Sequence, residues 1–351
     1  VGLVLVAAAA VFVAKGTNPG SIGGVSNVNA ISDLPVISKA PRPSLAIGKG
    51  FLNTKPLKEV DLKGKVVVYD FWTYSCINCV RTLPYLESWY QRYKDDGLVI
   101  VGVHSPEFDF EKNHHNVAAA AKKLGVNYPV VYDDDLDIWN AFNNSYWPAK
   151  YVTDRQGNVR FTHFGEGDYS QTEQVLRVLL GVKKDAPKAA DPKKPAENLT
   201  AAITPETYLG SERGSTESPE ELQSGPHHFT LPSSLSHNNF GLDGDWLVSK
   251  QFLESTDAKE NLDLRYQAGE VNLVMDRTNA TDAIAVIELD GQPVPASARG
   301  SSITERDGQT VVNVASADLY HLIANGPKGD HTLRIHPLGA GVQVYAFTFG
   351  S

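Results

Sequence analysis

The sequence predicts two domains of different class: an α/β domain with a mixed sheet, followed by an all-β, jelly-roll-like sandwich. The chain has 351 residues, which is too long for one ordinary domain. Residues 66–182 alternate strand-like and helix-like segments, whereas residues 228–349 hold only short strand-like runs. Residues 183–195 lie between the two parts and are rich in Lys, Pro and Ala, as linkers are.

The composition is that of a globular protein, and the charge excludes one class of partner. Hydrophobic residues make up 42% of the chain, and the formal net charge is −9 at pH 7. An acidic chain is repelled by phosphate backbones, so we expect no nucleic acid as a partner.

The first 14 residues form an uncharged apolar run that Lys15 closes. The run is shorter than the roughly 20 residues that span a bilayer, and it lacks the basic region of a signal peptide. We expect residues 1–14 to be the end of a transmembrane helix and residues 15–44 to be its solvated tether. The alternative is a buried helix or strand of the folded protein.

The first strand is expected at residues 66–72, a near-continuous apolar run such as buried central strands have. Asp70 interrupts the run, and a period of two places it on the same face as Val66 and Val68. A buried carboxylate is costly unless it is paired or protonated, so we expect a raised pKa. Asp70 either exchanges a proton with the Cys79 thiol or binds backbone groups at the strand end.

The only two cysteines of the chain, Cys76 and Cys79, follow this strand in a Cys-x-x-Cys pair. Two thiols one helical turn apart can form and resolve a mixed disulfide. The helix N-terminus is expected to lower the pKa of Cys76, whose thiolate would be the nucleophile. A zinc site is the alternative, but it needs two more ligands, and the histidine pairs at 114–115 and 227–228 lack the required spacing.

A helix is expected after Cys79, because apolar residues recur at helical spacing as far as Tyr93. Pro84 lies inside this helix and removes a backbone donor, so we expect a kink. Together with residues 66–72, the other elements make a small α/β unit. They are strands at residues 98–103, 128–132, 146–154 and 159–164, and helices at residues 118–124, 136–142 and 172–180.

Residues 45–182 resemble a thioredoxin fold, and are most similar to its extracytoplasmic TlpA-like branch. The resemblance implies a role for five residues: Asp70 as the buried acid, Cys76 as the nucleophile, Cys79 as the resolving thiol, Pro84 as the kinking proline and Pro148 as the cis-proline that faces the dithiol. It implies a substrate groove made of Trp72, Ile77, Asn78 and Trp147. The sequence departs from the family at the dipeptide Ile77-Asn78, at Ser75 and at Thr82.

Residues 72–84 read Trp-Thr-Tyr-Ser-Cys-Ile-Asn-Cys-Val-Arg-Thr-Leu-Pro, a more specific pattern. With the apolar run before it and a second domain after it, the chain resembles the soluble C-terminal region of the DipZ family. These are bacterial membrane proteins in which a CcdA-like electron-carrying membrane domain precedes a thioredoxin-like domain. The resemblance implies a membrane-tethered, extracytoplasmic thiol:disulfide oxidoreductase associated with cytochrome c biogenesis.

In this interpretation the CcdA-like membrane domain is the electron donor, and proteins that bear disulfides are the substrates. The chain would act as a reductase and would need no cofactor beyond the Cys76–Cys79 disulfide. Two alternatives stay open. Thr73-x-x-Cys76 matches part of the peroxiredoxin pattern, which indicates a peroxidase, although Tyr69 stands at the pattern's proline position. A non-enzymatic adaptor that binds glycan or protein, with the dithiol as a redox sensor, is the other.

The second domain is expected at residues 200–351, after a linker at residues 183–199 whose polarity predicts that the two domains work independently. Its strand pattern resembles carbohydrate-binding modules, which implies a carbohydrate ligand. Trp246, Tyr266, Tyr320 and Tyr345 either form a stacking platform for a sugar or belong to the core. The expected strands are residues 245–253, 262–266, 270–275, 283–289, 311–315, 319–323, 332–335 and 342–349.

Overall fold

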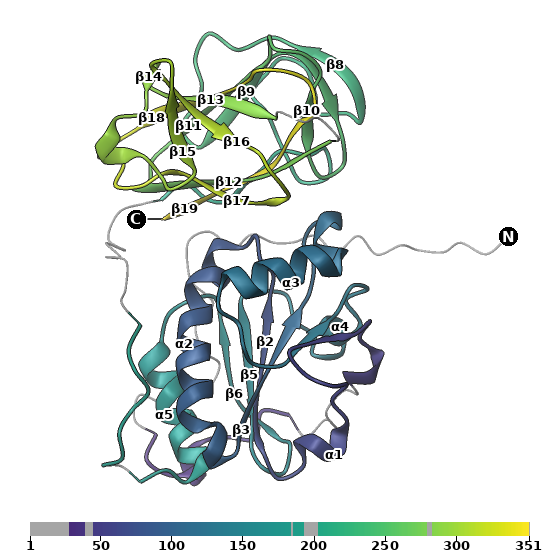
Figure 1. The fold of residues 1–351 in the computed structure, drawn as a ribbon, viewed down its shortest axis with the longest axis vertical. Coiled ribbons are helices and arrows are strands. Elements are labelled where there is room, and N and C mark those ends of the chain that lie inside the picture. Colours follow the sequence, from purple (N-terminus) through teal and green to yellow (C-terminus); the bar gives the residue numbers. More distant parts are fainter. Residues whose placement is uncertain (1–27, 39–44, 184, 193–202, 279–282, 351) are drawn as a thin grey trace, which may run out of the picture.

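The computed structural model describes residues 28–38, 45–183, 185–192, 203–278 and 283–350. They form an α/β domain and an all-β domain that lie against each other (Figure 1). The expected membrane segment, residues 1–14, lies outside the described residues, as does most of the tether. Within the described ranges, the structure has no helix with the length and apolarity needed to cross a bilayer.

The α/β domain is built on a six-stranded mixed sheet in the order β1-β4-β3-β2-β5-β6. Its central strand β2 (Val66–Trp72) is buried at every position. Strand β2 pairs in parallel with β3 (Leu98–His104) and antiparallel with β5 (Ala149–Thr153). The other strands are β1 (Phe51–Leu52), β4 (Val130–Tyr132) and β6 (Val159–Phe164).

The two faces of this sheet pack against different helices. The face that carries Val66 and Val68 contacts α2, α3 and α5, and the face that carries Val67 and Tyr69 contacts α1 and α4. Asp70 belongs to the first face by its period of two, so it points toward the layer that contains α2 and the cysteines. The bounds are α1 (Glu59–Leu62), α2 (Ile77–Tyr93), α3 (His114–Lys123), α4 (Asp137–Ala141) and α5 (Tyr169–Leu180).

Helix α3 begins at His114, four residues before the expected helix at 118–124. Its N-cap is Asn113, whose side chain accepts a hydrogen bond from the His115 N–H at 3.0 Å. The capping residue lies outside the apolar pattern, which explains the late expected start. Short 3-10 helices complete the chain: η1 (Ile31–Asp33), η2 (Leu45–Ile47), η3 (Lys94–Asp96), η4 (Asp109–Lys112) and η5 (Ala296–Ala298).

The second domain is antiparallel throughout, as expected, but its described strands join into one 13-stranded sheet that curves round a common core. Strand β9 makes the turn: residues from Asn239 to Asp243 pair with β11, and residues from Trp246 to Val248 pair with β10. The strands are β7 (Thr207–Tyr208), β8 (Gly225–Phe229), β9 (Asn239–Val248), β10 (Leu253–Ser255), β11 (Asn261–Tyr266), β12 (Glu270–Arg277), β13 (Ile284–Leu289), β14 (Gln292–Pro293), β15 (Ile303–Arg306), β16 (Gln309–Asn313), β17 (Asp318–Ile323), β18 (His331–Pro337) and β19 (Val342–Gly350).

One expected strand, residues 245–253, is wrong. The chain reverses inside it, so that its first part belongs to β9 and Leu253 pairs back on Val248 as the start of β10. Apolar residues on both sides of the reversal, Val248 and Phe252 among them, make the turn look like continuous strand. The short strands β7, β8, β14 and β15 were not expected either.

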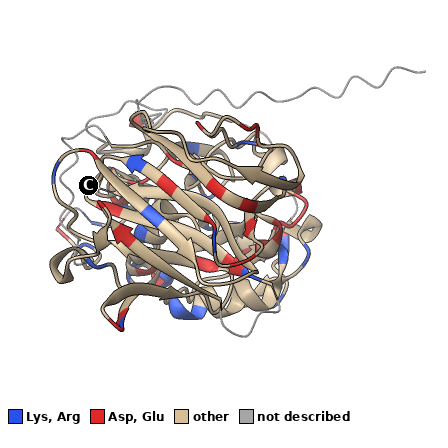
Figure 2. Ribbon diagram, turned by 90° about the horizontal axis from the view of Figure 1, so that it is seen from above, with Lys and Arg blue, Asp and Glu red and all other residues tan. Residues whose placement is uncertain are grey.

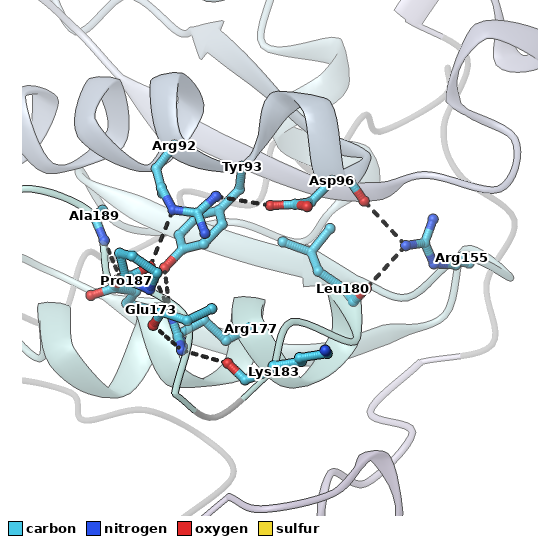
Figure 3. A network of polar contacts seen from close by, with 11 residues as sticks. Arg92, Tyr93, Asp96, Arg155, Glu173, Arg177, Leu180, Lys183, Pro187 and Ala189 are labelled. Atoms are coloured by element: carbon cyan, nitrogen blue, oxygen red, sulfur yellow. Dashed lines mark hydrogen bonds and ion pairs between the residues drawn. The ribbon is translucent and has the colours of Figure 1, made fainter.

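The segment after α5 is bound to the first domain. Residues 185–192, which we call the strap, lie against the C-terminal ends of α2 and α5 (Figure 3). Arg177 donates hydrogen bonds to the carbonyls of Lys183, Ala186 and Pro187, at 3.0, 2.9 and 3.1 Å. Glu173 accepts one from the Ala189 N–H at 2.7 Å. The first part of the expected linker is therefore anchored by hydrogen bonds between its backbone and side chains of α5.

Part of the expected tether is also packed against this domain. Val28 and Leu34 are buried in the same cluster as α2 and α5. The Ile37 N–H donates to the Val159 carbonyl at 2.9 Å, which places this segment beside β6. Residues 28–38 are thus part of the folded domain instead of a solvated tether.

Candidate active site

The dithiol lies at the N-terminus of α2. Cys76 is the N-cap of this helix, and its Sγ accepts a hydrogen bond from the Cys79 N–H at 3.3 Å. Cys76 is half-buried and Cys79 is completely buried, and both are unpaired thiols. Cys76 is therefore the thiol with some exposure to solvent, whereas Cys79 has none.

The expectation of a low pKa at Cys76 is wrong. Burial raises the pKa of Cys76 above the ordinary value of a thiol, hydrogen bonds with Cys79 oppose this, and the charges of Glu206 and Glu107 add to the rise. The helix N-terminus favours a thiolate, but the two carboxylates and the low polarity around the sulfur outweigh it. Glu206 belongs to the second domain, and no local pattern in the sequence places it here.

The inner thiol has a separate environment, made by β2 and β5. Asp70 stands opposite Lys150 in the β2–β5 register, and both side chains are completely buried. Burial raises the pKa of Asp70 to about 7, and the Lys150 charge opposes the rise. Burial also raises the pKa of Cys79, and the Asp70 charge contributes in the same direction. An acid that titrates near neutrality thus lies beside the buried thiol.

Lys150 was missed by the sequence analysis. It follows Pro148 by two residues in a strand that is buried at every position, and its Nζ donates to the Gly165 carbonyl at 3.4 Å. Burial lowers the pKa of Lys150, while the Asp70 charge raises it. A lysine inside an apolar strand next to the predicted cis-proline was the available signal, because such a residue needs a buried partner.

A buried glutamate holds the turn that leads into Cys76. Glu111 Oε1 accepts hydrogen bonds from the hydroxyls of Thr73 and Ser75, the latter at 2.6 Å. Its Oε2 accepts from the N–H groups of Glu107 and Phe108, at 2.7 and 3.0 Å. One carboxylate therefore ties the turn before the dithiol to the loop after β3, which meets the second domain.

The residues expected to form the substrate groove lie in different places. The Trp147–Pro148 bond is cis, as expected, and the half-buried Trp147 donates its indole N–H to the Ser105 carbonyl at 2.9 Å. Asn78 is partly exposed. Trp72 is completely buried, with its ring edge-on to His104. It therefore packs in the core of the domain and presents no surface to a substrate.

Ile77, the remaining groove residue, faces the second domain. It is 5% exposed and belongs to a cluster with Phe108 of the first domain and Val274, Leu319 and Tyr345 of the second. The β12, β17 and β19 part of the large sheet therefore covers the residue that follows Cys76. This contact argues against domains that work independently.

Ion pairs flank this apolar contact. Arg81 on α2 pairs with Glu270 on β12, and Lys123 on α3 pairs with Asp318 on β17, each at 2.5 Å. The Asp109 N–H donates to the Gln251 side chain at 3.0 Å. Elements from both domains thus meet around the N-terminus of α2.

The prediction of a stacking platform for a sugar is wrong. Trp246 and Tyr266 are 0% exposed, Tyr345 is 4% and Tyr320 is 8%, because the first two and Tyr320 belong to the core and Tyr345 to the domain interface. The face of the second domain that looks away from the first carries charged residues of both signs (Figure 2). Arg334 and Asp263, for example, form a two-point ion pair between β18 and β11.

Nothing in the described ranges suggests a bound metal ion: they contain no group of three or more His, Cys, Asp or Glu residues that could hold one.

Comparisons with known proteins agree with this geometry. The profile of the AhpC/TSA family matches residues 37–162, and that of a thioredoxin-like C-terminal domain matches residues 204–350. Protein DipZ of Mycobacterium bovis and of Mycobacterium tuberculosis is 38% identical over 318 residues, which is 88% of this chain and 42% of the relative. This chain thus spans less than half the length of these relatives.

A shorter relative is covered almost completely. The thiol-disulfide oxidoreductase YkuV of Bacillus subtilis is 30% identical over 142 residues, which is 40% of this chain and 95% of YkuV. Among solved structures, a thioredoxin-like protein in its oxidised form is 28% identical, with a TM-score of 0.36, and the match covers 38% of this chain and 89% of that protein.

Proposed function

We propose, from the premise that this chain belongs to the thioredoxin-like thiol-disulfide oxidoreductases, that it reduces disulfides in proteins through Cys76 and Cys79. The observation that carries the proposal is the arrangement of the thiols: an accessible sulfur at the N-cap of α2 and a buried sulfur one turn inside, next to Asp70 and Lys150. The cis-Pro148 loop beside them supports a groove for an extended substrate chain.

The reaction takes place in two exchanges. The Cys76 thiolate attacks a substrate disulfide; a mixed disulfide forms, the substrate S–S bond breaks and the leaving thiolate takes up a proton. The Cys79 thiolate then attacks the Cys76 sulfur, which releases the second substrate thiol and leaves the Cys76–Cys79 disulfide. Two electrons pass to the substrate. Asp70, whose pKa is raised to about 7, is placed to accept the Cys79 proton, with Lys150 to stabilise the resulting carboxylate.

The setting of the protein is proposed from its likeness to DipZ. The identity over 88% of this chain supports an extracytoplasmic domain that is tethered to the cell membrane and receives electrons from a CcdA-like membrane domain. A supply of electrons from that donor would make the chain a reductase, associated with cytochrome c biogenesis. Residues 1–14 would then be the end of a membrane helix.

A peroxidase is the alternative within the same fold. The match to the AhpC/TSA profile and the Thr73-x-x-Cys76 spacing favour it. The Thr73 hydroxyl, however, donates its hydrogen bond to Glu111, and a second thiol one turn from the first serves disulfide exchange. We therefore favour the reductase. The adaptor hypothesis loses its main support, since the four aromatic side chains proposed to bind a glycan are buried.

A direct comparison of two substrates tests the proposal. The protein reduced with dithiothreitol should speed the reduction of insulin by dithiothreitol and should consume hydrogen peroxide no faster than a Cys76→Ser/Cys79→Ser variant does. Peroxide consumption that depends on Cys76, without insulin reduction, would identify a peroxidase. Absence of both activities would leave the adaptor.

A further inference from the structure

A chain of polar groups connects the second domain to the turn before Cys76. Tyr208, on β7, has its hydroxyl oxygen 2.7 Å from Glu107 Oε1 and 2.9 Å from Glu206 Oε2. The Glu107 N–H donates to Glu111 Oε2 at 2.7 Å, and Glu111 Oε1 accepts from the Ser75 hydroxyl. The contacts run without a break from a carboxyl group of the second domain to the residue that precedes Cys76.

The number of available hydrogens shows which of the two glutamates is protonated. A phenol has one hydrogen and can donate it to only one of two carboxylates. Arg213 donates to Glu107 Oε1 at 2.8 Å, and its guanidinium lies 3.6 Å from the centre of the Tyr208 ring. Glu107 is therefore the ionised partner that accepts from the phenol, and Glu206 satisfies the third contact as a carboxylic acid that donates to the phenol oxygen.

The charges around Cys76 agree with this order. The groups that face its sulfur are Cys79 on its own helix, Glu107 on the loop after β3 and Glu206 on the segment before β7. Crowding by the two domains and the Glu107 charge raise the pKa of Glu206. Because Glu206 remains exposed to solvent, the Glu107 charge is the cause that the geometry supports. The Glu107 carboxylate disfavours a negative charge on Cys76, and Glu206 does so once it has lost its own proton.

The two nearest cations pair with other carboxylates than Glu206. Arg213 binds Glu107 within this cluster, and Arg81 on α2 binds Glu270 and Glu166. On the second domain, the apolar cluster around Ile77 excludes water from the side of the dithiol that faces β12, β17 and β19. The surroundings of Cys76 in the docked molecule thus contain two acids, of which only Glu107 is paired with an arginine, and a group of apolar side chains.

We propose that Glu206, which the second domain supplies and Tyr208 joins to Glu107, is a charge-tuning residue: when it ionises, its carboxylate favours the thiol form of Cys76 while the two domains are docked. The inference rests on the proposed function and deepens it, because it assigns the second domain a part in the redox site. Cys76 of the docked molecule is a slow nucleophile, which protects the reduced dithiol from unspecific oxidants.

The proposal leaves the exchange reaction balanced. Cys76 loses its proton to solvent, attacks the substrate disulfide and gains a sulfur bond, while the substrate thiolate that leaves takes a proton back from solvent. The electrons come from the dithiol itself, so the tuning changes how readily the first step begins and not what the reaction consumes or forms.

The test measures the reactivity of Cys76 against pH in the full chain. The reduced protein is treated with iodoacetamide, a neutral probe, and modification of Cys76 is followed by peptide mass spectrometry. Glu206→Gln should move the midpoint of the pH–rate profile to lower pH, and the rate at pH 8 should rise by up to about tenfold if the midpoint moves by one pH unit. Tyr208→Phe, which breaks the contact between the carboxyls and retains both, should give a smaller shift in the same direction.

The matched control is Asp318→Asn, which removes one carboxylate from the same interface at the ion pair with Lys123. Its profile should coincide with that of the wild type. Profiles of Glu206→Gln and wild type that coincide would overturn the inference, as would an equal shift in Asp318→Asn, which would indicate loosened docking instead of local charge. Insulin reduction by the wild type reports separately on the proposed function: a wild type without it refutes that function whatever the profiles are.

Discussion

The two thiols of this protein lie one helical turn apart and have unrelated surroundings. Cys79 is enclosed by the first domain alone, where neighbouring strands place one carboxylate and one lysine beside it. Cys76 lies where two domains meet, and its polar neighbours come from the loop after β3 and from the segment before β7. One environment balances opposite charges, and the other collects like charges.

This difference separates two tasks of a redox pair. The opposite charges near Cys79 provide a group that can take and return a proton, which the resolving step needs. The like charges near Cys76 make the attacking thiolate less stable, which sets when the first step begins. Changes near Cys79 should therefore alter the resolving step, and changes near Cys76 should alter the attacking step. Four variants examine this separation in order of expected effect.

The largest effect should come from the thiols themselves. Cys79→Ala should accumulate a mixed disulfide between Cys76 and a protein substrate, because the remaining thiol can attack but nothing in the chain resolves the product. Turnover should fall to the background rate. Non-reducing electrophoresis of the variant after incubation with oxidised insulin measures the adduct. An equal amount of adduct in Cys76→Ala would mean that the attack order is reversed.

Asp70→Asn should come next, with a loss on the order of 10²-fold in the resolving step. The wild-type rate of that step should rise with pH around 7, where Asp70 ionises, and the variant should lack this inflection. Stopped-flow decay of a preformed mixed disulfide measures it. A pH profile with the same inflection in both proteins would assign Asp70 a structural role.

The same variant has a consequence for stability. The folded state raises the pKa of Asp70 from 3.8 to about 7, so it binds a proton that the unfolded chain releases. The wild-type free energy of unfolding should then fall as pH rises from about 4 to about 7, and Asp70→Asn should flatten that fall. Urea titrations across this pH range show the slope.

Lys150→Met should have a smaller effect that depends on pH. The Lys150 charge lowers the pKa of Asp70, so its removal should move the inflection of the resolving step to higher pH. At pH 7 the step should slow by roughly fivefold if the inflection moves by one pH unit. The iodoacetamide profile of Cys76 should stay where it is. A change in that profile would show that the two environments are coupled.

A variant that loosens the strap should leave the reactivity of both thiols unchanged. Arg177→Gln removes three hydrogen bonds to backbone carbonyls at the far end of α2 and should lower the free energy of unfolding by about 1–3 kcal/mol. Arg155→Gln is the matched control, since Arg155 also binds carbonyls but is exposed (Figure 3). It should cost less. Altered alkylation of Cys76 in Arg177→Gln would contradict the separation.

The sequence predicted the inner environment in large part. A carboxylate on the buried face of a strand, followed by Cys-x-x-Cys, predicted Asp70 near Cys79, because strand alternation and helix spacing act over short distances. The cis-proline role of Pro148 was implied by the resemblance to thioredoxins. Lys150 was missed although the alternation that placed Asp70 was available for β5. Its apolar neighbours made a core position the simpler interpretation.

The outer environment was beyond the reach of local patterns. Glu107 and Glu206 are far apart in sequence, and their contact depends on how two domains dock. Period-two alternation in the second domain also failed to tell which side of a strand faces solvent: Trp246 and Tyr266 fit a platform and a core equally well, and the curvature of the sheet decided for the core. Tyr345 is buried by the other domain, a partner that its own strand does not reveal.

The anchored strap limits how far the second domain can lie from α2. The Ser88 hydroxyl binds the Ala190 carbonyl, at a point about 18 Å along α2 from Cys76 at 1.5 Å per residue. The chain from Ala190 to Ile203 reaches at most about 45 Å when extended. A tether of this length holds the second domain near α2 at an effective concentration on the order of millimolar. A substrate protein that displaces the second domain from Ile77 must compete with that local concentration, so dilute proteins are expected to meet the dithiol with Ile77 still covered.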